Sequence, residues 1–306
     1  KPRVTVPKGA AVASALQLLE SSSCSFVDLK DTGVRCALGR IFTGKATSEG
    51  KVVLAGPTNS KDVHSVIGFA APGSIVLLDG AFSRLSPMVG ADFLILATGA
   101  ARNKDSHRIA KEVNAIFRVM SLPKVPENSS ASMTVSGGLF IAGQGQELGW
   151  RLNGNRQQGA VRVQGIVNPK VFGETLKELR CSSTNRECGL CQSLTFIFDH
   201  PIMLLLSGDP LLWVSMFDTL ADAQCRVMVR SSKLLGVTVN PYLPSKSETG
   251  KYVADYVPPK AFLEDIRNLS NTPCTDIILE GPEKLYSWLD KLEISEGMGY
   301  SRSEAF

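Results

Sequence analysis

The chain has 306 residues, a length that corresponds to about two domains. Hydrophobic residues make up 43% of it and charged residues 20%, which argues against a disordered chain and leaves enough apolar side chains for an ordinary core. The net charge is only +4 and no basic run exceeds two adjacent residues, so nucleic-acid binding has little electrostatic support. No apolar stretch approaches the roughly 18 residues of a membrane span, and the first residues do not form a signal peptide.

Seven cysteines in a chain this long do not indicate a disulfide framework, because disulfides replace a core mainly in small secreted domains. We therefore expect reduced thiols, a cytoplasmic location and no contact with a membrane. The sequence leaves open whether the protein is a homo-oligomer.

The first half of the chain predicts strands that alternate with helices. Three continuous apolar runs predict strands buried on both faces, as in parallel sheets: Lys51–Gly56, Ser74–Gly80 and Asp92–Gly99. A helix is expected over residues 59–71, and a longer one over residues 104–120, where apolar residues recur at helical spacing. Strand–helix–strand units of this kind imply a parallel sheet with right-handed crossovers.

The second half repeats this pattern. Residues 126–160 are rich in Gly, Asn and Gln, and we expect them to connect an α/β domain over 1–125 with a second α/β region over 161–306. One strand is expected within the connection, at Leu139–Ala142. Further strands are expected at Arg162–Ile166, Leu194–Phe198, Arg226–Val229, Gly236–Asn240 and Asp276–Leu279. Helices are expected at Pro169–Arg180, Pro210–Ala223, Lys260–Leu269 and Pro282–Lys291.

Polar residues at strand ends are candidates for a ligand site. Asp79 follows four apolar residues at the end of a predicted strand, where P-loop NTPases place the acid that holds Mg²⁺. Thr98 and Gly99 end the neighbouring strand, and Asn240 ends another strand before a proline. Ligands of open α/β sheets bind outside the carboxyl ends of strands, so these residues could face one crevice. The alternative for each of them is an ordinary turn or capping residue.

Residues 39–46 fit the pattern G-x-x-x-x-G-K but are not expected to form a phosphate loop. Such a loop needs Ser or Thr after the lysine and a helix that begins there. Here Ala46 follows Lys45, and the chain leads into a strand. We interpret Gly44 and Gly50 as parts of a connection between two β-strands.

Cys181, Cys188, Cys191 and His200 form a candidate metal site. Three thiolates and one imidazole can satisfy tetrahedral zinc, and the C-x-x-C pair could instead be redox-active. The spacing matches no standard zinc module, so loop cysteines without metal are the competing interpretation. A Ser-His-Asp hydrolase is unsupported, because the chain has no G-x-S-x-G elbow.

Several segments together resemble a bacterial family, the ATPase subunit of the lysine aminomutase reactivase and its relatives. The segments are Val4–Gly9, Thr32–Arg35, Ala37–Gly39, Ala55–Pro57, Leu78–Arg84, Ala97–Ala100 and Leu235–Pro241, and their order and rough spacing hold over most of the chain. The resemblance implies a P-loop NTPase-like α/β domain joined to a second α/β region. It also implies a MutS-like ATPase partner subunit and a role in restoring a cobalamin- and pyridoxal-phosphate-dependent aminomutase.

On this resemblance the expected cofactor is ATP with magnesium, and Asp79 is the expected catalytic residue. The candidates for nucleotide contact are Gly56, Thr58, Gly80, Thr98, Gly99 and Asn240. The family's glycine-rich phosphate loop lies upstream of the Pro-x-Gly segment, and this chain begins just before that segment. We therefore expect a P-loop NTPase-like fold without an N-terminal phosphate loop, and ATPase activity only if such a loop precedes residue 1.

Two other functions compete with a nucleotide-dependent reactivation factor. The first is a non-catalytic α/β interaction subunit that binds no nucleotide. The second is a small-molecule enzyme that uses a cysteine-bound metal in the second α/β region.

Overall fold

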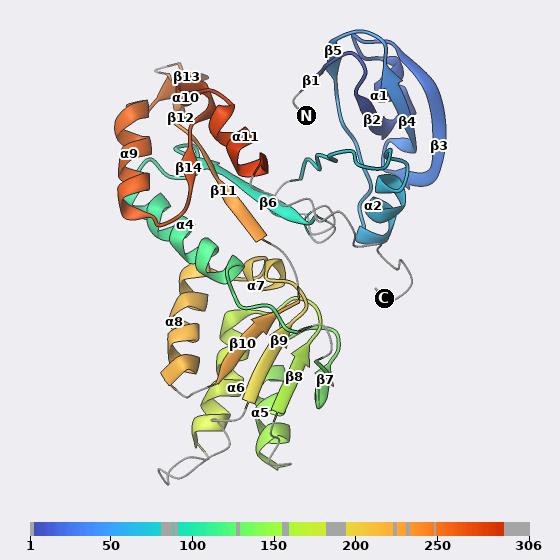
Figure 1. Ribbon diagram of the computed structural model, residues 1–306. Helices are drawn as coiled ribbons and strands as arrows, with labels where there is room; N and C mark the ends of the chain where they lie inside the picture. The colour runs from blue at the N-terminus through green and yellow to red at the C-terminus, as the bar shows by residue number, and fades with distance from the viewer. Residues whose placement is uncertain are drawn as a thin grey trace. The chain divides into compact units, whose positions relative to one another are not determined.

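The computed structural model describes residues 3–80, 88, 91–126, 129–154, 159–181, 194–222, 225–230, 233–247 and 249–290. It shows an α/β protein with parallel sheets and flanking helices, which confirms the predicted class (Figure 1). The chain divides into two compact units: residues 1–92, 124–208 and 228–232 form the first, and residues 93–123, 209–227 and 233–306 form the second. Among the described helices, none is long and apolar enough to cross a membrane.

The N-terminal part of the first unit is antiparallel β-structure. Its strands are β1 (Val4–Val6), β2 (Ala11–Ala15), β3 (Phe26–Cys36), β4 (Gly39–Ala46) and β5 (Gly50–Val52). They pair in the orders β2–β4–β3 and β1–β5, and the helices α1 (Leu16–Glu20) and α2 (Ser60–Ile67) accompany them. The turn between β3 and β4 ends at Gly39, whose φ of 113° suits glycine. Residues 39–46 are thus a strand, which agrees with our rejection of a phosphate loop.

A second sheet, which we call the β9 sheet, has the strand order β10–β9–β8–β7. Its strands are β7 (Met133–Val135), β8 (Gly159–Val163), β9 (Leu194–Phe198) and β10 (Arg226–Val229), and the first three are parallel. The helices of this region are α5 (Gln144–Gly154), α6 (Pro169–Cys181) and α7 (Ile202–Leu205). Helix α8 (Pro210–Asp222) follows in the chain and belongs to the second unit. Residues 126–160 therefore supply a strand and a helix of this fold as well as a connection.

Two glycines explain how closely α5 packs against α6. A Cβ atom at Gly145 would lie 1.9 Å from the carbonyl oxygen of Val171, and one at Gly149 would lie 2.4 Å from the Cβ of Glu178. No side chain fits at such distances, so the sequence needs glycine at both positions. On α6, Phe172 packs edge-on against Phe196 and Phe198 of β9, with ring centroids 5.0 and 5.7 Å away.

The second unit is built on a parallel sheet, which we call the β11 sheet, with the order β14–β11–β6. Its strands are β6 (Phe93–Gly99), β11 (Lys233–Asn240) and β14 (Cys274–Thr275). A hairpin of β12 (Tyr242–Lys246) and β13 (Tyr252–Tyr256) follows β11. The helices are α4 (Ser106–Met120), α9 (Pro259–Leu269), α10 (Ile277–Glu280) and α11 (Glu283–Asp290).

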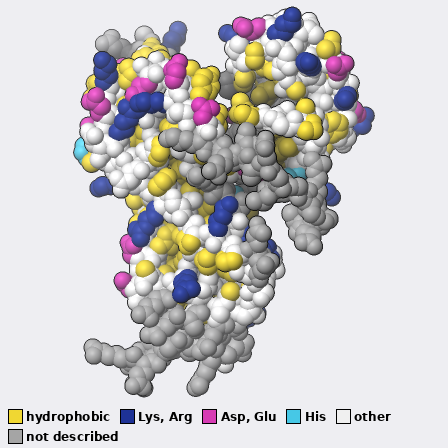
Figure 2. Space-filling view, viewed as in Figure 1, with side chains coloured by type: hydrophobic (Ala, Val, Ile, Leu, Met, Phe, Trp, Pro, Cys, Tyr) yellow, Lys and Arg dark blue, Asp and Glu magenta, His cyan; other side chains and the backbone are white. Residues whose placement is uncertain are grey.

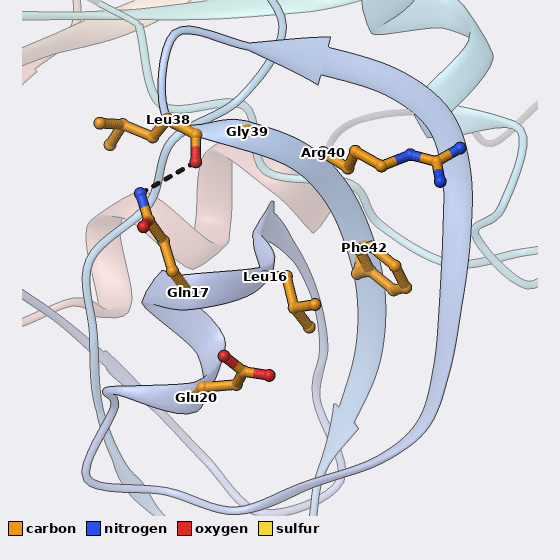
Figure 3. A pocket seen from close by; sticks show the side chains of 7 residues that line it. All are labelled: Leu16, Gln17, Glu20, Leu38, Gly39, Arg40 and Phe42. Atoms are coloured by element: carbon orange, nitrogen blue, oxygen red, sulfur yellow. Dashed lines mark hydrogen bonds between the residues drawn. The ribbon is translucent and has the colours of Figure 1, made fainter.

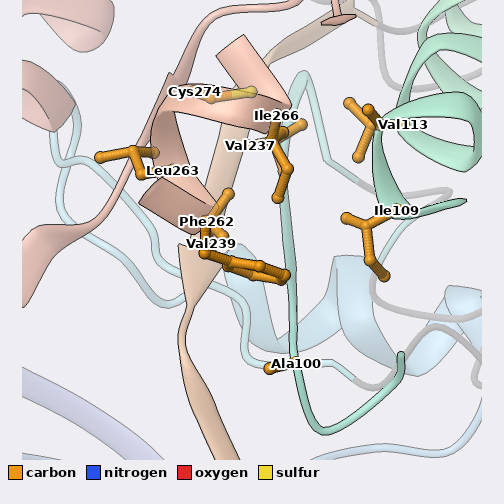
Figure 4. Close-up of a cluster of buried hydrophobic side chains, with 10 residues drawn as sticks. Ala100, Ile109, Val113, Val237, Val239, Phe262, Leu263, Ile266 and Cys274 are labelled. Carbon is orange, nitrogen blue, oxygen red and sulfur yellow. The ribbon is translucent and has the colours of Figure 1, made fainter. Parts of the chain in front are cut away.

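Helices cover both faces of β11. On one face, α4 and α9 bury an apolar cluster against Val237 and Val239 (Figure 4). The cluster is completed by Ala100, Ile109, Ala110, Val113, Phe262, Leu263, Ile266 and Cys274. On the other face, a Cβ atom at Gly236 would lie 2.6 Å from the ring of Trp288, so α11 packs directly on the strand. This layering is the physical reason for the continuous apolar run in β11.

The strand predicted at Ser74–Gly80 is wrong. Residues 74–80 have no regular secondary structure, and the side chains of Ile75 and Leu77 are 71% and 83% exposed. An apolar run forms a strand only where a neighbouring strand and a covering layer accept it. No strand in the described part of the chain pairs with this segment. Asp79 therefore does not stand at the end of a strand.

Three other predicted strands need correction. Lys51–Gly56 contributes only its first two residues to β5, which is antiparallel rather than parallel. In Leu139–Ala142, only an isolated bridge at Leu139 forms. Asp276–Leu279 contains the start of helix α10, because the Asp276 carboxylate accepts the N–H groups of Ile278 and Leu279 as an N-cap. The remaining predicted strands and helices are confirmed, with ends shifted by a few residues.

Candidate functional site

The structure brings Thr98, Gly99 and Asn240 together at one end of the β11 sheet. The strands β6 and β11 are parallel neighbours, in a register that pairs Thr98 with Val239 and Gly99 with Asn240. The carboxyl ends of the two strands therefore meet, at the place where open α/β sheets bind ligands. We call this place the β6/β11 edge.

Gly99 and Asn240 approach each other through their backbones. A Cβ atom at Gly99 would lie 2.1 Å from the Asn240 carbonyl oxygen, and the N–H of Ala100 donates to the same oxygen over 2.9 Å. The side-chain oxygen of Asn240 accepts the N–H of Tyr242, also over 2.9 Å. Asn240 thus orders the following turn, which is the structural role that competed with a ligand contact. Its side-chain NH₂ group has no partner among the described residues.

The loop from β6 to α4, residues 100–105, lies at the β6/β11 edge. The N–H groups of Arg102 and Asn103 donate back to the carbonyl oxygen of Gly99, over 3.0 and 3.5 Å. The N–H groups of Ala101 and Lys104 have no partner within the described part of the chain, and both residues are exposed. The loop therefore presents two backbone donors to a ligand.

Charge at this loop is mixed. The Arg102 guanidinium pairs with Glu112 of α4, whereas Lys104 forms no ion pair with a described residue. The Asp105 carboxylate caps α4 by accepting the N–H of His107 over 3.0 Å. The Asp105 carboxylate occupies the N-terminus of α4, so that end of the helix is not open to another anion. An anion at this edge would therefore contact Lys104 and the backbone donors of the loop.

A network of charged hydrogen bonds lies at the β14 edge of the β11 sheet, opposite β6. Arg267 of α9 donates to the carbonyl oxygen of Cys274 over 2.8 Å and to the Glu280 carboxylate over 2.8 Å. Thr275 and Lys284 donate to Glu280 over 2.9 and 2.7 Å. These bonds, and the one from Arg267 most of all, lower the pKa of Glu280 to about 2. The network ties α9, β14, α10 and α11 together, and its role is structural.

The other nucleotide candidates lie in the first unit. Asp79 and Gly80 lie in the irregular segment, and Asp79 is exposed without a hydrogen bond or ion pair to a described residue. Gly56 and Thr58 lie between β5 and α2, in the first unit. No group of three His, Cys, Asp or Glu side chains that could hold a metal ion occurs among the described residues. The magnesium role of Asp79 and nucleotide contact by these four residues therefore stay predictions.

His200, the candidate fourth zinc ligand, is buried with one ring nitrogen hydrogen-bonded. Its Nδ1 accepts the N–H of Ile202 over 3.1 Å, and burial lowers the pKa of His200 to about 4. A neutral ring whose Nδ1 accepts a hydrogen bond carries its proton on Nε2, and a metal ion at Nε2 would have to displace that proton. That Nε2 is buried without a partner among the described residues. Cys188, Cys191 and the side chain of Cys181 lie outside the described residues, so the cysteine cluster stays a prediction.

A shallow cavity of about 320 Å³ lies between α1 and β4 in the N-terminal part (Figure 3). Leu16 and Phe42 line it, and Gln17 donates from its side chain to the Leu38 carbonyl oxygen over 2.9 Å. Arg40 at its rim pairs with Asp31 across the β3–β4 hairpin, over 2.8 Å. None of the residues predicted from sequence for a nucleotide or metal lines this cavity.

Sequence reasoning missed two polar pairs near the carboxyl ends of the β9 sheet. Arg162 pairs with Asp199 over 2.7 Å, and the Ser136 hydroxyl lies 3.1 Å from the side-chain oxygen of Gln164. Three of these residues follow β7, β8 and β9 directly, so the strand-end argument applied to Asn240 could have found them. It could equally have found Lys104, which lies in the loop after β6.

Basic and acidic side chains are interspersed over the face seen in Figure 2, and no continuous basic belt appears on it. This distribution agrees with the small net charge. The chain matches no family model, no curated protein and no solved structure.

Proposed function

We propose that this chain is a nucleotide-dependent accessory factor that helps to restore a cobalamin- and pyridoxal-phosphate-dependent aminomutase, together with a MutS-like ATPase subunit. The nucleotide binds at the β6/β11 edge. The observation that carries this site is the parallel register that places Thr98–Gly99 beside Val239–Asn240. The aminomutase and the partner subunit rest on the sequence resemblance, which includes both of these segments.

The chemistry of the edge suits the phosphates of a nucleotide. Lys104 supplies a positive charge, and the N–H groups of Ala101 and Lys104 supply donors without other partners among the described residues. Backbone donors in a loop after a parallel strand are a common means of holding phosphate oxygens. We include a P-loop NTPase-like fold in this proposal. The helices on both faces of β11 support it.

The proposal covers binding rather than hydrolysis. Asp79 forms no hydrogen bond or ion pair with a described residue, so we assign it no step of ATP cleavage. The proposal includes a cytoplasmic location, and the free thiols of Cys24, Cys36 and Cys274 in the described part of the chain are typical of a reducing compartment.

Calorimetric titration of ADP and ATP into the protein encoded by the complete gene tests this function. Lys104→Ala should weaken ADP binding by about 3- to 10-fold, the usual effect of one solvent-accessible charged contact. Lys61→Ala removes the same charge from exposed α2 in the first unit and should leave the affinity unchanged. No binding at millimolar nucleotide, or equal losses in both variants, would refute a nucleotide site at the β6/β11 edge.

The second candidate function is an interaction subunit without nucleotide. The exposed side chains of Ile75 and Leu77 favour it, because adjacent exposed apolar side chains mark contact surfaces. It predicts that Ile75→Ser with Leu77→Ser abolishes co-purification with the partner subunit, while Asp79→Ala retains it. Co-purification that survives the double substitution would remove this candidate.

A further inference from the structure

Three of the five tyrosines of the chain lie in one short hairpin, on the same face. The register of β12 and β13 pairs Tyr242 with Tyr256 and Lys246 with Tyr252. Residues at even positions along each strand point to one side, so all three rings share a face. The rings of Tyr242 and Tyr256 lie edge to face, with centroids 5.8 Å apart and planes at 69°. Tyr256 is 60% exposed, so much of this residue is accessible to a ligand.

The base of this hairpin is attached to the β6/β11 edge. Tyr242 follows Asn240 by two residues, a distance of about 7 Å at most along the chain. The N–H of Tyr242 donates to the Asn240 side chain, and the N–H of Val257 donates to the Pro241 carbonyl oxygen over 3.1 Å. Both strands of the hairpin are thus fixed where β11 ends (Figure 1).

The loop that carries Lys104 is anchored to the same residue. The N–H of Ala100 donates to the Asn240 carbonyl oxygen over 2.9 Å. Asn240 therefore anchors both the loop that carries Lys104 and the hairpin that carries the tyrosine pair. This combination fits a ligand with an anionic part and a flat ring. Phosphate groups bind to cationic side chains and backbone N–H donors, and flat rings stack on aromatic side chains.

Resting on the nucleotide binding proposed above, we propose that Tyr242 and Tyr256 are the stacking platform for the nucleotide base. The phosphates contact the loop of residues 100–105, and the base lies on the exposed face of the tyrosine pair. The chemical class of the ligand is then a purine or pyrimidine nucleotide, rather than a bare phosphate ester.

The tip of the same hairpin provides a matched control. Tyr252 is 72% exposed, but the ammonium group of Lys246 lies 5.6 Å from its ring centroid and already covers one face. It is four residues along the strand from Tyr256, roughly 13 Å away. A substitution there changes the same kind of residue on the same surface without touching the platform.

The test compares ADP with inorganic pyrophosphate in calorimetric titrations. Tyr256→Thr should weaken ADP binding by about 5- to 100-fold, the usual effect of losing one aromatic–base stack, and leave pyrophosphate affinity unchanged. Tyr256→Phe should retain ADP affinity because it retains the ring, and Tyr252→Thr should behave as the unmodified protein. Circular dichroism confirms that each variant is folded.

The outcomes separate this inference from the proposed function. If the unmodified protein binds neither ADP nor pyrophosphate, the nucleotide function itself fails. If it binds ADP and Tyr256→Thr binds equally well, the function stands and the platform is refuted. Equal losses of ADP and pyrophosphate affinity would also refute the platform, because they would show that Tyr256 merely supports the fold of the edge.

Discussion

Replacing Gly99 with alanine should lower the free energy of unfolding, because the ends of β6 and β11 are in backbone contact at this position. In Gly99→Ala the new Cβ would meet the Asn240 backbone at 2.1 Å, and backbone atoms cannot rotate away as a side chain can. The ends of β6 and β11 must separate, which also stretches the bond from the Ala100 N–H to the Asn240 carbonyl oxygen. Overpacking costs about 1–3 kcal/mol and the loss of one buried hydrogen bond about 1 kcal/mol, so unfolding should become easier by about 2–4 kcal/mol.

Urea unfolding followed by tryptophan fluorescence measures this change. Trp213 is fully buried and Trp288 packs on Gly236, so both report on the second unit. Gly56→Ala is the matched control, because a Cβ atom there has no neighbour within 4 Å. We expect the control to change the free energy of unfolding by less than about 0.5 kcal/mol. A loss below about 0.5 kcal/mol in Gly99→Ala would show that the two strand ends are not in backbone contact.

Three further predictions concern the contact of two helices and the titration of two side chains. Gly145→Ala should cost about 1–3 kcal/mol in urea unfolding, because α5 and α6 must separate; an unchanged midpoint would refute their contact. The folded-state pKa of Glu280, about 2, lies below its ordinary value of 4.5. The stability it contributes is therefore complete above about pH 4.5 and lost as the pH falls towards 2; Glu280→Gln should remove this dependence and cost about 1–3 kcal/mol at pH 7. The folded-state pKa of His200, about 4, lies below its ordinary 6.5, so the unfolded state binds its proton first and stability falls as the pH drops from 6.5 to 4. His200→Asn should flatten this part of the stability curve, and an unchanged slope would show that His200 is not buried in its neutral form.

The sequence predicted well those elements whose local pattern and tertiary surroundings agree. The helix α4 has a capping Asp105 and a buried stripe that includes Ile109 and Val113, and both signals are visible in the sequence. The strand β11 is continuously apolar because α4, α9 and α11 cover it on both faces. The Asn-Pro pair that follows its apolar run is a turn signal, and this pattern alone predicts that Asn240 ends the strand.

The sequence failed where an apolar run has no partner or a capping residue changes its conformation. Residues 74–80 have the composition of a strand, but no described strand accepts them, so Ile75 and Leu77 stay exposed. The short apolar run after Asp276 could equally have been a strand by its pattern. It forms a helix because the Asp276 carboxylate accepts two backbone N–H groups. The antiparallel strands of residues 3–52 carry only partly buried faces, which blurs the alternation on which strand prediction depends.

The candidate site was predictable only in part, because sequence order does not show which loops meet. Thr98, Gly99 and Asn240 could be proposed from strand ends alone. Lys104 could have been proposed in the same way, because it lies in the loop after β6. The contribution of the Tyr242–Tyr256 pair depends on the register of β12 with β13, and a single sequence does not specify that register.

Hydrogen–deuterium exchange with and without saturating ADP tests most directly whether the β6/β11 edge binds a nucleotide. We predict slower exchange in peptides that cover residues 99–105 and 241–257, and unchanged exchange in the β4 strand over residues 39–46. Protection confined to peptides outside the second unit, or no protection at millimolar ADP, would contradict the assignment of the nucleotide site.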